Sequence, residues 1–245
     1  MKKINEKEAI NMLINLNQRL MLDNKEHIKK YYRIRDLHSQ ILDSMNNYID
    51  SGKLKVEEYF AIAFKEIKEE LNKGFSLDNT KYPDKIIFDE LFMYKNHNEI
   101  PSLTEIFIEK KKIKEINKLK LLNAMNESIV GLFKIIDCDS INGYVTLKEV
   151  FTNKEYKIID ISLSSTYVIN KNEERYMYNR IITYDGISFG TGLPIVFSSN
   201  YKRLKEFIKK YKDKKINDFT KCILLYEISK DKDNKVMSNI KTNYN

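Results

Sequence analysis

The segment RYMYNRIITY at positions 175–184 carries side chains that could bind nucleic acid. If it forms a β-strand, alternate residues share one face, and that face holds Tyr176, Tyr178 and Arg180. Unpaired bases stack on tyrosine rings and on the planar guanidinium group of arginine. The pattern is therefore compatible with a surface for single-stranded nucleic acid. The alternative is packing alone, because tyrosine also has a high propensity for strands.

A basic stretch follows this segment at positions 202–215. It contains eight basic and two acidic residues, a large share of the chain's net charge of +8. Five of its cations are candidates for contacts with phosphates: Lys202, Arg203, Lys205, Lys209 and Lys210. The alternative is a solvated helix face in a lysine-rich chain, since only six of the 43 basic residues are arginine. The sequence is compatible with both interpretations.

Three of the chain's seven glycines lie within YDGISFGTGLP at positions 184–194, a density that could mark a phosphate-binding loop. A Walker loop needs a Lys-Ser or Lys-Thr pair at the start of a helix, and neither follows here. Asp185-Gly186 is instead typical of a tight hairpin turn. Gly190 and Gly192 share one face, where they allow a bend or the close approach of another segment. We therefore expect these glycines to shape a strand.

Other chemistry has weaker support. The Asp-Cys-Asp triplet at 137–139 contains metal ligands and a nucleophile, but the three histidines all lie in the first half of the chain. Aspartate beside an Asn-Gly pair also favours a turn. No Cys-x-x-Cys or His-Glu-x-x-His spacing occurs, so we predict no metal site and no cofactor. An enzyme site assembled from distant residues, with Asp160, Arg180 and Asp185 as candidates, is a third hypothesis.

Helical periodicity dominates the N-terminal half. Apolar residues recur at steps of three and four over 31–48, and His38 lies on the same face, which predicts a histidine in the core. Further helices are predicted over 56–71, over 83–94 and, from a capping box, over 102–126. We expect the last of these to break near EKKKIKE, because its apolar period drifts there.

Alternation with a period of two begins near position 128. We predict five strands, at about 129–137, 143–151, 155–163, 175–184 and 187–197. Turn residues separate successive strands at 142–143, 152–154 and 185–186, and short turns imply antiparallel pairs. The prediction is an antiparallel meander that forms a curled sheet or a partly open barrel, followed by one or two C-terminal helices.

Several turn and core residues of this region follow the order of a known β-domain pattern: Gly131, Phe133, Val145-Thr146-Leu147, Tyr156, Ile158, Arg180 and Gly186. Over about 128–197 the chain thereby resembles a small β-domain of uncharacterised bacterial proteins. Some of those proteins carry a cysteine-rich zinc tail of the SEC-C type, which this chain lacks. The chain also departs from the pattern by having Asn153-Lys154 at a turn. The resemblance implies a β-fold and a family without an assigned activity.

We expect an α+β protein with a helical region at 1–127, a β-domain with C-terminal helices at 128–230 and a flexible tail at 231–245. Two cysteines are too few for a disulfide framework, and no apolar run is long enough to cross a bilayer. We therefore expect a cytoplasmic protein without a membrane partner. The first functional hypothesis is a non-enzymatic interaction module whose neutral helical half binds a protein partner or a second copy. Nucleic-acid binding is the alternative.

Overall fold

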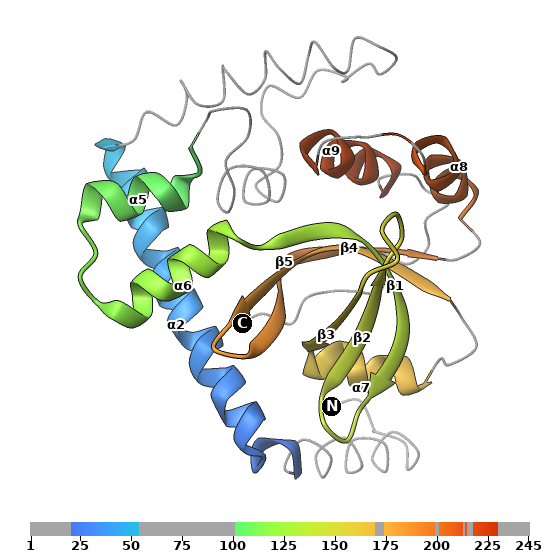
Figure 1. Cartoon of the computed structure of the whole chain (residues 1–245), viewed down its shortest axis with the longest axis horizontal. Coiled ribbons are helices and arrows are strands. Elements are labelled where there is room, and N and C mark those ends of the chain that lie inside the picture. The colour runs from blue at the N-terminus through green and yellow to red at the C-terminus, as the bar shows by residue number, and fades with distance from the viewer. Residues whose placement is uncertain are drawn as a thin grey trace, which may run out of the picture.

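The computed structural model describes residues 21–53, 101–169, 174–198, 201–212, 214 and 218–229. Helices surround a five-stranded barrel (Figure 1). The helices predicted over 56–71 and 83–94 and the tail at 231–245 lie outside the described residues. None of the described helices is long and apolar enough to span a bilayer.

Helix α2 spans Glu26–Tyr48 and confirms the first predicted helix. Its buried side chains recur at steps of three to six residues: Ile28, Ile34, His38, Ile41 and Met45. This spacing gives one apolar stripe, which faces the rest of the molecule. His38 lies on the stripe and is buried, so the prediction of a core histidine is confirmed. A short π-helical turn, η1 (Ile49–Lys53), follows α2.

The helix predicted over 102–126 is divided in two, as its drifting apolar period indicated. Helix α5 spans Leu103–Lys111 and α6 spans Ile116–Asn126. The predicted capping box begins α5: the Ser102 hydroxyl accepts from the Glu105 N–H at 3.0 Å, and the Glu105 carboxylate accepts from the Ser102 N–H at 2.8 Å. Lys112 ends α5 in the left-handed conformation, with φ of 49°. The break therefore lies within the EKKKIKE stretch.

Five strands follow: β1 (Ile129–Asp139), β2 (Tyr144–Glu149), β3 (Glu155–Ile159), β4 (Arg175–Tyr184) and β5 (Ile187–Ser198). The three predicted turns are confirmed by residues with positive φ between the strands: Gly143, Asn153, Asp185 and Gly186. Consecutive positive φ values at Asp185 and Gly186 are the geometry of the tight turn that twisted hairpins prefer.

The strands close into a barrel in the order β1-β2-β3-β5-β4. The α+β class and the five strands are confirmed, and four of the five pairings are antiparallel. The fifth, between Ile159 of β3 and Phe189 of β5, is parallel, so the predicted antiparallel meander is wrong at this pairing. Helix α7 (Ile161–Ile169) precedes β4, where the sequence had predicted the end of a strand. This crossover allows the parallel closure, and the resulting strand order is that of the OB-fold.

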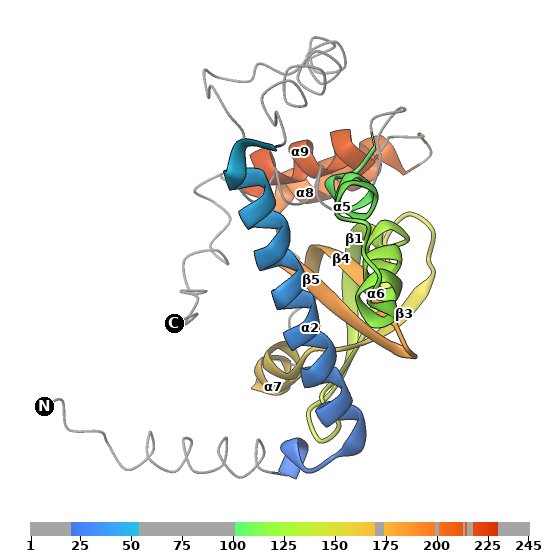
Figure 2. The same cartoon turned by 90° about the vertical axis from the view of Figure 1, so that its left-hand side faces the viewer.

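The barrel separates two groups of buried side chains. Eight of them fill its interior: Phe133, Ile135, Val145, Leu147, Ile158, Met177, Ile181 and Val196. A larger cluster lies between the outside of the barrel and the helices. Helix α6 contacts β4, while α2 and α9 (Asp218–Ser229) contact β5 (Figure 2). Strands β4 and β5 are therefore covered on both faces.

Gly190 confirms the structural interpretation of the glycine-rich segment. A Cβ atom at this position would lie 2.5 Å from Nδ2 of Asn179 on the neighbouring strand, closer than two such atoms can approach. The register of β4 against β5 also shifts between Tyr178 and Arg180. The missing side chain thus lets the two strands approach at the irregularity.

Candidate nucleic-acid interface

The β4 residues predicted to stack on bases differ in exposure. Tyr178 and Arg180 are each only 2% exposed, and Tyr176 is half-buried. Met177 and Ile181 point into the barrel, so the alternate residues point outward, where the helices cover them. At Tyr178 and Arg180 the burial therefore favours the other interpretation of this segment, in which the side chains pack inside the protein.

Arg180 is held by hydrogen bonds within the protein. Its Nη1 donates to the Ser128 hydroxyl at 2.8 Å, and Ser128 is itself buried between α6 and β1. The Arg180 backbone N–H donates to Oδ1 of Asn179 at 2.8 Å. The guanidinium thus joins β4 to the segment that enters the barrel.

The N-terminal end of β4 is polar and lies near the basic helix. Glu174 pairs with Lys134 of β1, and the hydrogen bond from Lys134 lowers the pKa of the Glu174 carboxyl. The charge of Lys205 adds to this lowering, which places Lys205 in the same electrostatic environment. Burial, together with the Glu174 charge, raises the pKa of Tyr176, so its phenol is neutral at neutral pH.

Helix α8 (Lys202–Tyr211) presents a charged face to solvent. All five predicted phosphate contacts are exposed: Lys202, Arg203, Lys205, Lys209 and Lys210. Lys212, just beyond the helix, is exposed as well. Glu206 is the acidic residue on this face and lies 3.9 Å from Lys202. The helix thus carries a strong positive charge where a ligand can reach it.

Apolar contacts hold α8 in this orientation. Leu204 and Phe207 are buried, and the Phe207 ring packs edge-on against Phe151 of the β2–β3 loop, with centroids 6.2 Å apart. Tyr201 precedes the helix and donates its hydroxyl to the Ile228 carbonyl of α9 at 2.8 Å. Because one side is anchored, the cations are fixed on the other.

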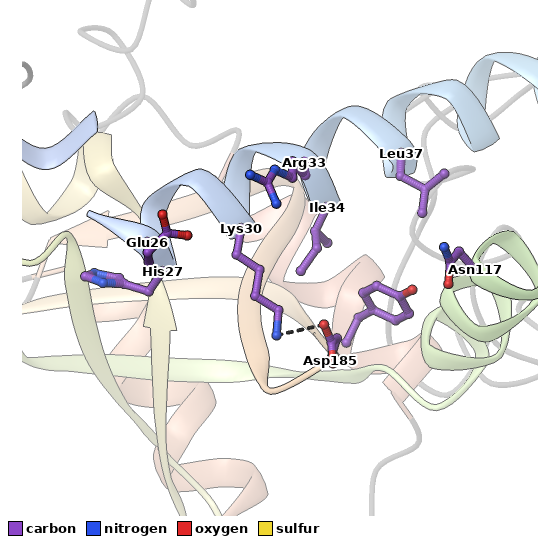
Figure 3. A pocket seen from close by; sticks show the side chains of 9 residues that line it. Glu26, His27, Lys30, Arg33, Ile34, Leu37, Asn117 and Asp185 are labelled. Carbon is purple, nitrogen blue, oxygen red and sulfur yellow. Dashed lines mark ion pairs between the residues drawn. The ribbon is translucent and has the colours of Figure 1, made fainter. Parts of the chain in front are cut away.

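A groove of about 450 Å³ lies between α2, α6 and the β4–β5 turn (Figure 3). Its lining residues are Glu26, His27, Lys30, Arg33, Ile34, Leu37, Asn117, Tyr184 and Asp185. Lys30 points from α2 to Asp185, and their charged atoms are 2.7 Å apart. Two acidic residues balance the lysine and the arginine, so this groove does not favour a polyanion.

The residues of the enzyme hypothesis have separate partners. Asp185 pairs with Lys30, and Arg180 donates to Ser128. Asp160 accepts from the Leu163 N–H at 2.8 Å at the start of α7, and burial raises the pKa of its carboxyl. Each of the three residues therefore has a local structural role.

The Asp-Cys-Asp triplet adjoins a turn. The Asp139 carboxylate accepts from the Asn142 backbone N–H at 3.0 Å and from its side-chain amide at 2.7 Å. These bonds lower the pKa of the Asp139 carboxyl and support the turn interpretation. Within the described part of the chain, no three His, Cys, Asp or Glu side chains lie close enough to hold a metal ion.

An aromatic cluster at the β1–β2 turn escaped the sequence analysis. The rings of His27 and Tyr144 are parallel within 6°, with centroids 5.1 Å apart. The Lys157 ammonium lies 4.1 Å from the Tyr144 ring centroid. Nε2 of His27 lies 2.9 Å from the Asn142 carbonyl oxygen, and Lys25 donates to the Asn142 side chain at 2.5 Å. No local pattern joins these residues, because α2 and β2 are more than a hundred positions apart in the sequence.

One comparison with known proteins identifies a family. The family model DUF7986, described as a family of unknown function, matches residues 25–239, which include the β-domain recognised from the sequence. No curated protein and no solved structure matches the chain. A relation to proteins with SEC-C-type tails stays a prediction. Because the match covers most of its length, the chain belongs to DUF7986, a family of unknown function.

Proposed function

We propose that this chain is a non-enzymatic protein that binds nucleic acid through the exposed face of α8. The observation that carries the proposal is the concentration of five exposed cations in one anchored helix, with Glu206 as the acid among them. Cations fixed on one side of a rigid element attract a phosphate backbone and release its counterions. The helix is about 15 Å long, enough to contact several phosphates.

The predicted binding mode is insensitive to base sequence at α8. Lysine ammonium groups contact phosphates as point charges and carry little sequence information. Tyr178 and Arg180, the β4 residues that could have read bases, are buried. We therefore expect strong salt dependence and similar affinity for strands of different sequence.

The barrel is compatible with this role. OB-fold barrels commonly bind oligonucleotides and oligosaccharides across strands β2 and β3 and the adjacent loops. One fold can serve many functions, so the barrel topology agrees with nucleic-acid binding but does not establish it. The proposal depends on the positive charge of α8.

Fluorescence anisotropy with a labelled single-stranded oligonucleotide tests the proposal. Replacing Lys202, Arg203, Lys209 and Lys210 together by Gln should weaken binding at low salt by about tenfold or more and flatten the salt dependence, by about 0.7 per lost contact in the log–log slope. The matched control replaces four exposed lysines of α5, α6 and their link: Lys110, Lys112, Lys114 and Lys120. It removes the same charge and should bind like the wild type. Absence of binding at low salt, or equal losses in both variants, would contradict the proposal.

Self-association is the second candidate function. The groove between α2 and α6 has balanced charges, and Ile116, next to the lining residue Asn117, is 66% exposed. Such a mixed surface suits a second copy of the chain better than a polyanion. Light scattering should then give a dimer that Ile116→Asp converts to a monomer, and a monomeric wild type would contradict this candidate.

A further inference from the structure

We infer that the His27–Tyr144 pair is a stacking site for one unpaired base of the bound nucleic acid. This inference rests on the proposed function and adds to it a preference for single strands. It assigns a binding role to a part of the molecule distant in sequence from α8.

The two side-chain rings are stacked in the same way as an aromatic side chain and a nucleic-acid base stack. The two rings are nearly parallel, and their separation is that of an offset stack between aromatic planes. His27 also lines the groove beside α2, whose charges balance, so the stack borders space that an uncharged base could enter while its phosphates stay outside the groove. A base can therefore extend the stack at His27 without rebuilding the barrel.

Cations surround the stack. Lys157 lies over the Tyr144 ring, and Lys25 donates to Asn142 in the turn that also holds His27. Two acids lie nearby: the Asp139 carboxylate is engaged by Asn142, and Glu26, next to His27, lines the same groove. An incoming nucleotide thus meets aromatic planes for its base and ammonium groups for its phosphate, the combination found in single-strand binding proteins.

A row of side chains connects this site with α8. Lys205 acts on Glu174, which pairs with Lys134, and Lys134 lies directly opposite Lys148 of β2. Like charges at opposed positions of two strands are unfavourable in the absence of an anion. Glu155 lies opposite Lys148 on β3 and ends the row. Lys148 and Tyr144 belong to the same face of β2, so one strand of nucleic acid can contact both regions.

Removal of the aromatic ring tests the inference by affinity. His27→Leu should weaken binding of a single-stranded oligonucleotide by about fivefold to tenfold, the effect of losing one base–aromatic stack, while His27→Phe should bind like the wild type. An abasic oligonucleotide with the same phosphates should bind the wild type and His27→Leu equally. Duplex of the same length should be insensitive to both substitutions.

A fluorescence reporter tests the contact directly. The chain contains no tryptophan, so His27→Trp introduces a single indole at the position that the base would contact. Its emission should fall when an oligonucleotide binds, whereas the control Tyr32→Trp, at a position on α2 that is 44% exposed, should keep its emission.

The outcomes separate the two ideas. If the α8 variant loses binding but His27→Leu does not, and the reporter at position 27 stays unquenched, this inference is overturned and the proposed function stands. If no nucleic acid binds at low salt, both are overturned. If His27→Leu does not fold, the fluorescence reporter decides the question: an unquenched indole overturns the inference and a quenched one supports it.

Discussion

The sequences of strand β4 and helix α8 both offered candidate surfaces for nucleic acid, but in the structure the candidate residues of β4 are mostly buried and those of α8 are exposed. In β4, six consecutive residues from Met177 to Ile182 are buried. In α8, burial is restricted to the apolar side, and the cations are exposed. A periodic pattern thus identifies which residues share a face. Whether that face meets water depends on what else packs there.

The polar side chains of α8 can reach solvent, whereas those in the middle of β4 cannot. The apolar residues of α8 occupy about one side of the helix, so a single contact with the barrel and α9 satisfies them and leaves the charges outside. β4 lies between the barrel interior and a layer of helices. A polar residue there needs an internal partner, which Arg180 finds in Ser128.

The sharpest test of this comparison replaces one arginine in each element. Arg180→Ala should lower the free energy of unfolding by about 3 kcal/mol or more, because it leaves a cavity and removes the donor to Ser128. Arg203→Ala, on the exposed side of α8, should change it by no more than about 0.5 kcal/mol. Urea unfolding measures both. Similar losses in the two variants would show that the contrast between β4 and α8 is wrong.

The close approach of β4 and β5 gives a second test. Gly190→Ala should cost about 1–3 kcal/mol, because the new methyl group collides with the buried Asn179 side chain. Asn179→Ala removes the atom that collides, so the double variant should lose less stability than the sum of the single variants. Strict additivity of the two losses would contradict this close packing.

His38 tests burial through pH. Burial, with the nearby Arg35 charge as a smaller cause, lowers the pKa of His38 from 6.5 to about 3. Below pH 6.5 His38 is therefore protonated in the unfolded chain but stays neutral in the folded chain. The free energy of unfolding therefore falls as the pH falls towards 3. From pH 7 to pH 5 the loss should be about 2 kcal/mol.

Urea titrations at the two pH values measure this loss. His38→Gln should remove that part of the pH dependence whatever its absolute stability, because glutamine does not titrate in this range. Replacing the partly exposed His27 by Gln should leave it in place. An unchanged pH dependence in His38→Gln would show that position 38 is not the source.

The features of the fold that were predicted correctly depend on interactions between residues close in the sequence. The Ser102 capping box, the break near Lys112 and the turns at Gly143 and Gly186 depend on backbone conformations that a few adjacent residues determine. Helix α7 was missed because ISLSSTYVI is apolar and β-branched at several positions, which favoured a strand, although Asp160 directly before it accepts from the Leu163 N–H and caps the helix. Its place between β3 and β4 then decides the parallel closure, a non-local result.

The candidate site divides in the same way. The amphipathic pattern of α8 was sufficient to predict its exposed cations, because one helix contains the whole signal. The His27–Tyr144 stack depends on contact between α2 and the start of β2. The burial of Tyr178 and Arg180 likewise depends on helices that pack from outside β4. Pairings of this kind have no local signature in a single sequence.

The smallest expected effect is on the stability of the α8 variant. Replacing Lys202, Arg203, Lys209 and Lys210 by Gln should change the free energy of unfolding by no more than about 0.5 kcal/mol. Lys209 and Lys210 gain from the helix dipole in the last turn, but repulsion along the basic face, as between Lys205 and Lys209, opposes this gain. Urea unfolding at low and moderate salt measures the balance. A loss above about 1.5 kcal/mol would show that these cations stabilise the fold and would remove the contrast with β4. Unchanged stability with weakened binding would show that they serve to bind a ligand.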